Sequence, residues 1–298
     1  MAELKPPVIV VGNYRSGTTM LYNLLGAHSD LEKWFEPRTI WQYADPRRKH
    51  DRFTEEDARP GVKRYIRRRF LQRQRQFGGR RIVEKTPTNV LRMRYVHEIF
   101  PESKIVYIVR DPFASIASAD KHGTRRPTNF RRARARLREC PKTQIHCYAG
   151  NFLKQHFNRR VLGKRVFGIW GVRYPGAQEE FGRLSHAEFI ARQWAECARI
   201  ASEDVAYLRE RSPGTVVELR YEEFVADPVG QFRCVLEAND LEMTPELEAH
   251  VSASVDSGRQ TKWKKFDQGA LEKAVSIVEE EMTRHGYRVP DELRQGTG

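Results

Sequence analysis

Short runs of β-branched residues recur along the chain, each bounded by charged, Gly or Pro residues, as is typical of buried strands. Between them, apolar residues recur every three or four positions, which is typical of amphipathic helices. Because strands and helices alternate, the chain predicts a mostly parallel sheet with helices on both faces. The predicted strands are 8–11, 81–83, 104–109, 165–170 and 215–219, and the predicted helices are 18–27, 62–77, 91–99 and 187–210.

The remaining segments complete this prediction of an α/β fold. From residue 227 onward the chain predicts a helical C-terminal part. The stretch 122–160 is rich in arginine, contains two prolines and has little apolar periodicity, so we expect a basic insertion or lid over the sheet. We therefore predict a single domain over residues 1–298, with three α/β/α layers and a roughly five-stranded sheet.

The composition is that of an ordinary globular protein with an unusual charge. Hydrophobic residues make up 39% and charged residues 31% of the 298 residues, but the net charge is +14. Such a balance favours an acidic partner: a nucleic acid, a membrane surface, an anionic glycan or a charged nucleotide. The first apolar run, of about five residues, is too short for a signal segment or a membrane span, so we expect a cytoplasmic protein. The four cysteines and nine histidines show no zinc-ligand spacing, so we expect no metal site.

A glycine-rich loop, residues 12–19, follows the first predicted strand and opens a helix. Its backbone N–H groups would converge on an anion at the helix N-terminus. A nucleoside-triphosphate loop places Lys after its second glycine, but here that position is Thr18 and the cation is Arg15. A planar guanidinium suits a compact anion such as a phosphosulfate better than a triphosphate with Mg²⁺. A kinase or NTPase, and a turn without a ligand, are the weaker alternatives.

Charged residues also follow the other predicted strands. Glu84-Lys85 follows the second strand, Arg110-Asp111-Pro112 the third, and Arg220-Tyr221 the last. In an open parallel sheet, ligands bind beyond the carboxyl ends of the strands. Cations at several strand ends therefore predict a pocket for more than one phosphate.

At these residues the chain resembles the sulfotransferases that use 3′-phosphoadenosine 5′-phosphosulfate (PAPS), whose fold is P-loop-like. Residues 14–19 resemble the 5′-phosphosulfate loop, in the Arg form of tyrosylprotein and bacterial carbohydrate sulfotransferases, and residues 108–118 resemble the 3′-phosphate motif. Weaker resemblances lie at 84–87, 221–228 and 260–263, in the family's order.

The resemblance implies roles for individual residues. Those expected to bind the donor are Arg15, Ser16, Gly17, Thr18, Thr19, Arg110, Ser118, Tyr221, Lys262 and Trp263. Glu36, which follows Arg15 by 21 residues, is the expected general base, although a lone Glu is commonly a solvated surface charge. Arg15 and Lys85 would stabilise the charge of the leaving group, and Thr261 would add a hydrogen bond. An ion pair with a neighbouring acid is the alternative for Lys85.

The expected reaction is transfer of a sulfuryl group from PAPS to a hydroxyl of a sugar, glycolipid or small molecule, by in-line displacement. The alternative acceptor is a peptidyl tyrosine, which the spacing from Arg15 to Glu36 favours. Two arginine clusters, at 64–75 and 125–138, would suit peripheral contact with an anionic membrane or an acidic acceptor. They lack interleaved aromatic residues, so we expect no nucleic-acid partner. Trp194 lies on an amphipathic stretch and is expected in the core.

Overall fold

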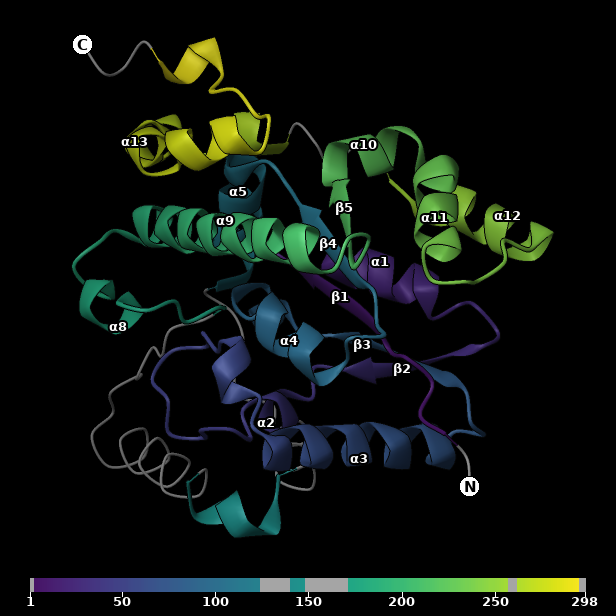
Figure 1. Ribbon diagram of the computed structural model, residues 1–298. Coiled ribbons are helices and arrows are strands. Elements are labelled where there is room, and N and C mark those ends of the chain that lie inside the picture. The colour runs from purple at the N-terminus through teal and green to yellow at the C-terminus, as the bar shows by residue number, and fades with distance from the viewer. Residues whose placement is uncertain (1–2, 124–139, 148–170, 257–261, 295–298) are drawn as a thin grey trace, which may run out of the picture.

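A computed structural model of the chain describes residues 3–123, 140–147, 171–256 and 262–294 (Figure 1). Its centre is a five-stranded sheet of order β2-β3-β1-β4-β5, in which every neighbouring pair is parallel. The strands are β1 (Val8–Gly12), β2 (Leu31–Phe35), β3 (Arg81–Lys85), β4 (Ile105–Val109) and β5 (Val216–Arg220). The carboxyl ends of all five strands therefore meet at one edge of the sheet.

The sheet is covered on both faces, because side chains along its inner strands alternate between two cores. In β1, Val8 and Val10 pack into one hydrophobic cluster, while Ile9 and Val11 pack into the other. All four are fully buried. A continuous apolar run such as this is the pattern of a central parallel strand.

The helices form the two outer layers (Figure 1). One layer consists of α1 (Thr18–Leu25), α10 (Tyr221–Ala226), α11 (Pro228–Glu237) and α12 (Pro245–Ser254). The other consists of α2 (Arg38–Trp41), α3 (Pro60–Gln76), α4 (Met93–Ile99), α5 (Pro112–Gly123), α8 (Ala177–Glu180), α9 (His186–Arg211) and α13 (Gln268–Arg284). The predicted three-layer α/β/α fold with a helical C-terminal part is confirmed.

The sheet differs from the prediction in one strand. Four of the predicted strands form, but β2 was not expected from the sequence. It lies at the edge of the sheet and pairs with β3. It buries only Leu31 and Trp34, so the sequence shows no apolar run at this strand. The predicted strand 165–170 lies outside the described residues, as does most of the predicted lid 122–160.

None of the helices in the described part of the chain is both long and apolar enough to cross a membrane.

Candidate active site

The glycine-rich loop connects the end of β1 to the start of α1. Its backbone turns through left-handed conformations at Arg15, with φ of 68°, and at Gly17, with φ of 99°. A Cβ atom on Gly17 would lie 2.7 Å from the Tyr221 ring, so only glycine fits there. No side chain caps the N-terminus of α1. The first N–H groups of α1 are thus directed toward the loop, as in an anion site.

The loop also buries polar side-chain atoms. Ser16 and Asn13 are fully buried, and within the described structure neither the Ser16 hydroxyl nor the side-chain Oδ1 of Asn13 has a hydrogen-bond partner. Thr18 is buried and Thr19 is exposed. Buried hydroxyls in folded proteins are normally hydrogen-bonded. The unsatisfied hydroxyl of Ser16, in a loop shaped for an anion, therefore fits a phosphate or phosphosulfate ligand.

The two donor motifs predicted from the sequence meet in the structure. The Arg15 Nε donates a hydrogen bond to the Ser118 hydroxyl over 2.9 Å. The Arg110 Nη1 donates to the main-chain oxygen of Arg15 over 3.2 Å. Gly12 in β1 lies opposite Ile108 in β4, which brings the residues after both strands together. Two guanidinium groups from segments 95 residues apart thus share one site.

Two of the predicted donor-binding residues are aromatic, Tyr221 and Trp263. Tyr221 is 4% exposed at the start of α10, and the Arg110 guanidinium lies 4.2 Å from its ring centre. Trp263 is partly buried, with its ring centre 6.0 Å from that of Phe113 on α5. Thr261 and the side chain of Lys262 lie outside the described residues. Tyr221 therefore lies against the Arg110 guanidinium, and Trp263 packs on α5, the helix that carries Ser118.

A second charged group lies at the ends of β2 and β3. Lys85 is paired with Phe35 in β2 and Val10 in β1, so it lies beside the strand that leads into the loop. Its Nζ is 3.0 Å from the Glu36 Oε1, and 4.4 Å from the centre of the Phe35 ring. Only 3% of the Lys85 side chain is exposed. The ion pair that the sequence allowed for Lys85 is present, and its partner is the expected base.

Glu36 is enclosed by two cations. Its Oε2 accepts hydrogen bonds from the Arg38 Nε at 3.1 Å and Nη2 at 2.9 Å, while its Oε1 faces Lys85. Its side chain is 13% exposed, so the alternative of a solvated surface charge is wrong. Burial by itself would raise the pKa of Glu36, but the charges and hydrogen bonds of Arg38 and Lys85 outweigh burial and hold the pKa below its ordinary value. The carboxylate is ionised at neutral pH.

Arg38 was missed by sequence reasoning. It lies two residues after Glu36 in the short helix α2, and its N–H donates to the main-chain oxygen of Glu36 over 2.7 Å. Glu36 itself has a φ of 49°, a left-handed turn that folds the chain back between β2 and α2. The contact between Glu36 and Arg38 forms only because the chain turns here. The sequence does not indicate this turn, so it could not indicate the contact.

Two acidic residues follow the ends of β4 and β5 in the chain: Asp111 and Glu222. Burial raises the pKa of Asp111 to about 6, the nearby Glu222 adds to the rise, and the N–H of Ala114, which donates to Asp111 Oδ1 over 2.8 Å, opposes it. Glu222 accepts from the Asp111 N–H over 3.2 Å and from the Tyr287 hydroxyl over 2.7 Å. These contacts tie the C-terminal segment to the residues that follow Arg110.

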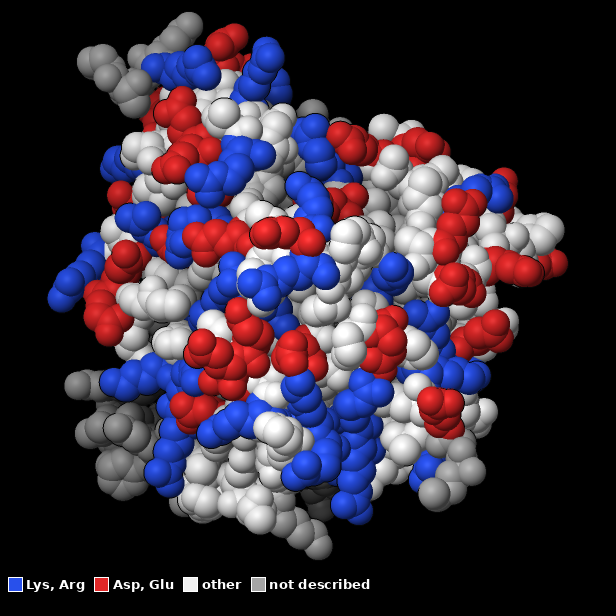
Figure 2. All heavy atoms as spheres, in the orientation of Figure 1, with Lys and Arg blue, Asp and Glu red and all other residues white. Residues whose placement is uncertain are grey.

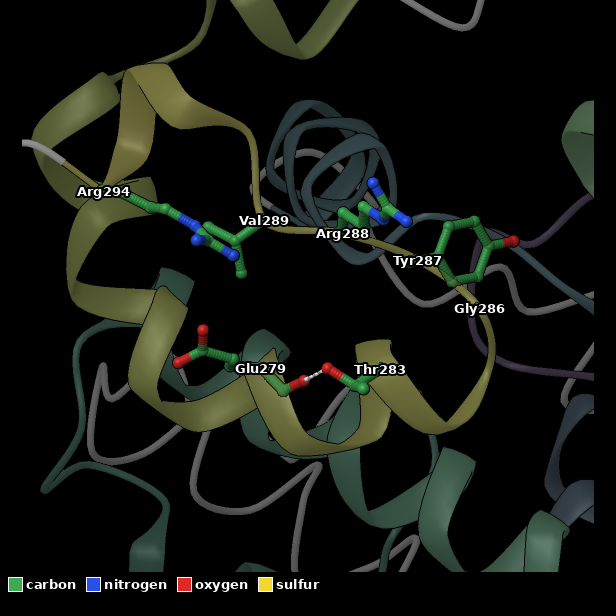
Figure 3. A pocket seen from close by; sticks show the side chains of 7 residues that line it. All are labelled: Glu279, Thr283, Gly286, Tyr287, Arg288, Val289 and Arg294. Carbon is green, nitrogen blue, oxygen red and sulfur yellow. Dashed lines mark hydrogen bonds between the residues drawn. The ribbon is translucent and has the colours of Figure 1, made fainter.

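A pocket lies between α13 and the segment after it (Figure 3). Tyr287 lies at one end of this pocket and Arg294 at the other. The described residues that line it are Glu279, Thr283, Gly286, Tyr287, Arg288, Val289 and Arg294, and none of them is among the predicted site residues. Among the described residues, no group of His, Cys, Asp and Glu could hold a metal ion.

The basic helix α3 is partly neutralised by acids outside it. Figure 2 shows Lys and Arg side chains gathered over the lower part of one face, where α3 lies, with acidic side chains among them. The ion pairs join Lys63 to Glu98, Arg67 to Glu102 and Arg73 to Glu32. Much of this charge run is thus a paired surface.

Known proteins resemble the chain in sequence pattern and in fold. A family model described as the sulfotransferase family matches residues 6–169, more than half of the chain. No curated protein sequence matches the chain.

Three solved structures show the same fold at low sequence identity. The sulfotransferase domain from the curacin biosynthetic pathway is 16% identical with a TM-score of 0.54, over 97% of this chain and all of that one. The sulfotransferase STF9 from Mycobacterium avium is 14% identical with a TM-score of 0.52, over 97% of this chain and 79% of that one. The sulfotransferase domain from the Synechococcus PCC 7002 olefin synthase is 14% identical with a TM-score of 0.50, over 97% and 98%.

Proposed function

Because the chain belongs to the sulfotransferase family, we propose that the site at the strand ends binds PAPS and that the sulfuryl group passes to a hydroxyl acceptor. The observation that carries this proposal is the link between the two donor motifs. The Arg15 side chain reaches Ser118, and the Arg110 side chain reaches the loop. A nucleotide with two phosphate groups needs cationic groups for both, and these contacts place one guanidinium on each of two adjoining segments.

Each part of the site has a place in donor binding. The loop N–H groups and the Ser16 hydroxyl would hold the 5′-phosphosulfate, together with Arg15. Arg110 and Ser118 would hold the 3′-phosphate, and Tyr221 and Trp263 would flank the adenine side. The buried unpaired hydroxyl of Ser16 supports the first assignment.

When bound, the donor supplies an activated sulfur with a phosphate leaving group. Glu36 would take the proton of the acceptor hydroxyl while the acceptor oxygen bonds to sulfur and the bond from sulfur to the phosphate oxygen breaks. Lys85 and Arg15 would stabilise the charge that develops on the leaving oxygen. Both oxygens of the ionised Glu36 carboxylate are bonded to Lys85 or Arg38. One oxygen must therefore release its cation before it can accept the proton of the acceptor hydroxyl.

The acceptor would lie against Phe35. This side chain is 48% exposed, which is unusual for a large apolar residue, and it lies beside both Glu36 and Lys85. The ring of Tyr22, which is buried, has its centre 5.9 Å from that of Phe35 and supports it from below, so Phe35 presents an aromatic surface next to the base. Such a surface suits an acceptor with a ring or an apolar face beside its hydroxyl: a sugar, a lipid-linked glycan, a small phenol or a peptidyl tyrosine.

Donor binding is tested with adenosine 3′,5′-bisphosphate, the product nucleotide. The bisphosphate should raise the Tm of the wild type, and Arg110→Ala should remove most of this shift. Arg233→Ala is the matched control, because Arg233 on α11 pairs with Glu248 on α12 and is not among the strand-end cations. The control should keep the shift. A wild type that responds neither to the bisphosphate nor to PAPS contradicts the proposal, and Mg-ATP hydrolysis would favour a kinase or NTPase.

The acceptor class is tested by mass spectrometry. The enzyme and PAPS are incubated with glycans, glycolipids, phenols and acidic tyrosine peptides, and a mass gain of one sulfuryl group identifies the acceptor. Sulfated peptides beside unmodified glycans would select the tyrosine alternative, and the reverse would exclude it.

A further inference from the structure

Trp194 connects both halves of the donor site from the middle of α9. The sequence predicts this residue in the core, and it is 3% exposed. Its indole Nε1 donates a hydrogen bond to the main-chain oxygen of Arg110 over 2.9 Å. Its own main-chain oxygen accepts a hydrogen bond from the Asn13 Nδ2 over 3.4 Å. The polar atoms of one core residue therefore bind one group in each donor motif.

These two contacts close a ring of hydrogen bonds. Asn13 lies in the loop after β1, and Arg110 is the first residue after β4. The Arg110 side chain donates to the Arg15 oxygen in the same loop. The loop is thus bound to Arg110 directly and a second time through Trp194. The pairing of β1 with β4 places Gly12 opposite Ile108. The register of this pair ends there, before the residues that would hold the phosphates.

The indole of Trp194 is itself held in place by α13. Its ring centre lies 6.2 Å from that of His285, edge to face. The His285 Nδ1 is 2.9 Å from the Glu281 main-chain oxygen, and its Nε2 is 3.3 Å from the Tyr107 hydroxyl. Burial lowers the pKa of His285, so the ring is neutral, with Nδ1–H donating to Glu281 and Nε2 accepting from Tyr107. The indole is therefore held by its own helix, α9, and by the His285 ring directly after α13.

We propose that Trp194 is a positioning residue for the donor: it fixes the distance between the phosphate loop and Arg110, and so matches the two ends of the site to one nucleotide. The proposal rests on the assignment of these motifs to a nucleotide with phosphates at both ends. Trp194 acts through Arg110 and Asn13 and need not touch the nucleotide. Removal of the Trp194 side chain should weaken donor binding more than an equal loss of core packing elsewhere in α9.

Trp194→Phe tests this role, because it removes the N–H group and keeps most of the packing. Leaving the buried Arg110 oxygen without its donor allows that segment to shift, so we expect a loss of affinity for adenosine 3′,5′-bisphosphate of about five- to fiftyfold in isothermal titration. KM for PAPS should rise by a similar factor, with a smaller fall in kcat. Ile200→Val is the matched control, since Ile200 lies buried in the same helix and in the same hydrophobic cluster. The control should lose thermal stability and keep its affinity.

A double-mutant cycle separates positioning from general loosening. In an Arg110→Ala background the side chain that Trp194 orients is absent, so Trp194→Phe should lose most of its effect on bisphosphate affinity. Asn13→Ala is a second variant, in which the loop loses its contact with Trp194 while the tryptophan stays. It should weaken bisphosphate binding in the same direction.

The outcomes distinguish the two proposals. Unchanged bisphosphate affinity in Trp194→Phe, or effects that simply add in the Arg110→Ala background, would overturn the positioning role. A wild type that does not bind the bisphosphate would instead overturn the donor assignment.

Discussion

The ion-paired carboxylate of Glu36 allows the chemistry to be tested separately from donor binding. Glu36→Gln keeps the size of the side chain and one acceptor oxygen, but it removes the negative charge between Arg38 and Lys85. The contacts of Arg15 and Arg110 with each other and with Ser118 do not involve Glu36. The substitution should therefore change turnover and stability without changing the nucleotide site.

The cost in stability follows from the burial of the two cations. Lys85, with 3% of its side chain exposed, would remain buried opposite a neutral amide, whereas Arg38 is 32% exposed and can turn to solvent. Removing one partner of a buried pair costs about 3–5 kcal/mol. Because the amide oxygen keeps one hydrogen bond, we expect a loss of about 2–3 kcal/mol in unfolding free energy. For a chain of this size, that corresponds to a fall in Tm of roughly 3–5 °C.

The cost in turnover is expected to be larger. A positioned general base contributes about 10²- to 10⁴-fold to the rate, or about 3–5 kcal/mol of barrier. The assay measures sulfated product from PAPS by mass spectrometry, and bisphosphate affinity by titration at a temperature well below the Tm of the variant. Glu210→Gln is the control, because Glu210 is exposed near the end of α9. It should match the wild type in both measurements.

Two results would refute this reasoning. Wild-type turnover in Glu36→Gln would show that another group takes the acceptor proton. Parallel loss of turnover and bisphosphate affinity would show that Glu36 acts by holding Lys85 in the donor site and not as a base.

Three further substitutions probe the surroundings of the site. In Arg38→Met the pKa of Glu36 should rise, so the acid limb of the kcat/KM profile should move to higher pH. Gly17→Ala would place a Cβ 2.7 Å from the Tyr221 ring at a φ of 99°, so stability should fall by about 1–3 kcal/mol and bisphosphate affinity should fall with it. The pKa of Asp111 is raised to about 6, so its contribution to stability is lost as pH rises from about 4 through 6. Asp111→Asn should therefore gain about 1–3 kcal/mol relative to the wild type between pH 4.5 and 7.5, measured by urea unfolding.

The central part of the fold could be predicted from the sequence because burial on both faces leaves an unbroken apolar run. Residues 8–11 and 105–109 show such runs, and both form inner strands. Residues 31–35 do not, because an edge strand buries only part of its surface. Its pairing with β3 depends on the tertiary structure, which no local pattern encodes. The omission matters for function, since β2 carries Phe35 and leads to Glu36.

The grouping of the strand-end cations, where we propose that the donor binds, was predictable for a different reason. The carboxyl ends of parallel strands meet at one edge, so Arg15, Lys85 and Arg110 had to lie near one another once the strands were identified. The acceptor half follows no such rule. The contacts of Glu36 with Lys85 and Arg38 depend on a left-handed turn after an edge strand. Sequence spacing selected Glu36 as a candidate base but could not show that its carboxylate is shared by two cations.

The hydrogen bonds of Trp194 explain why we propose a role at the site for a residue that the sequence assigned to the core. Apolar periodicity identifies its face of α9, but an indole also carries an N–H group, which needs an acceptor when buried. At the end of a parallel strand, main-chain carbonyls pass beyond the last sheet partner and need donors. The Arg110 oxygen and the Trp194 N–H satisfy each other for this reason. In a fold that binds ligands at strand ends, a buried aromatic residue with a polar atom near such an end therefore contacts the site as well as the core, and this double contact is the basis of the role that we propose for Trp194.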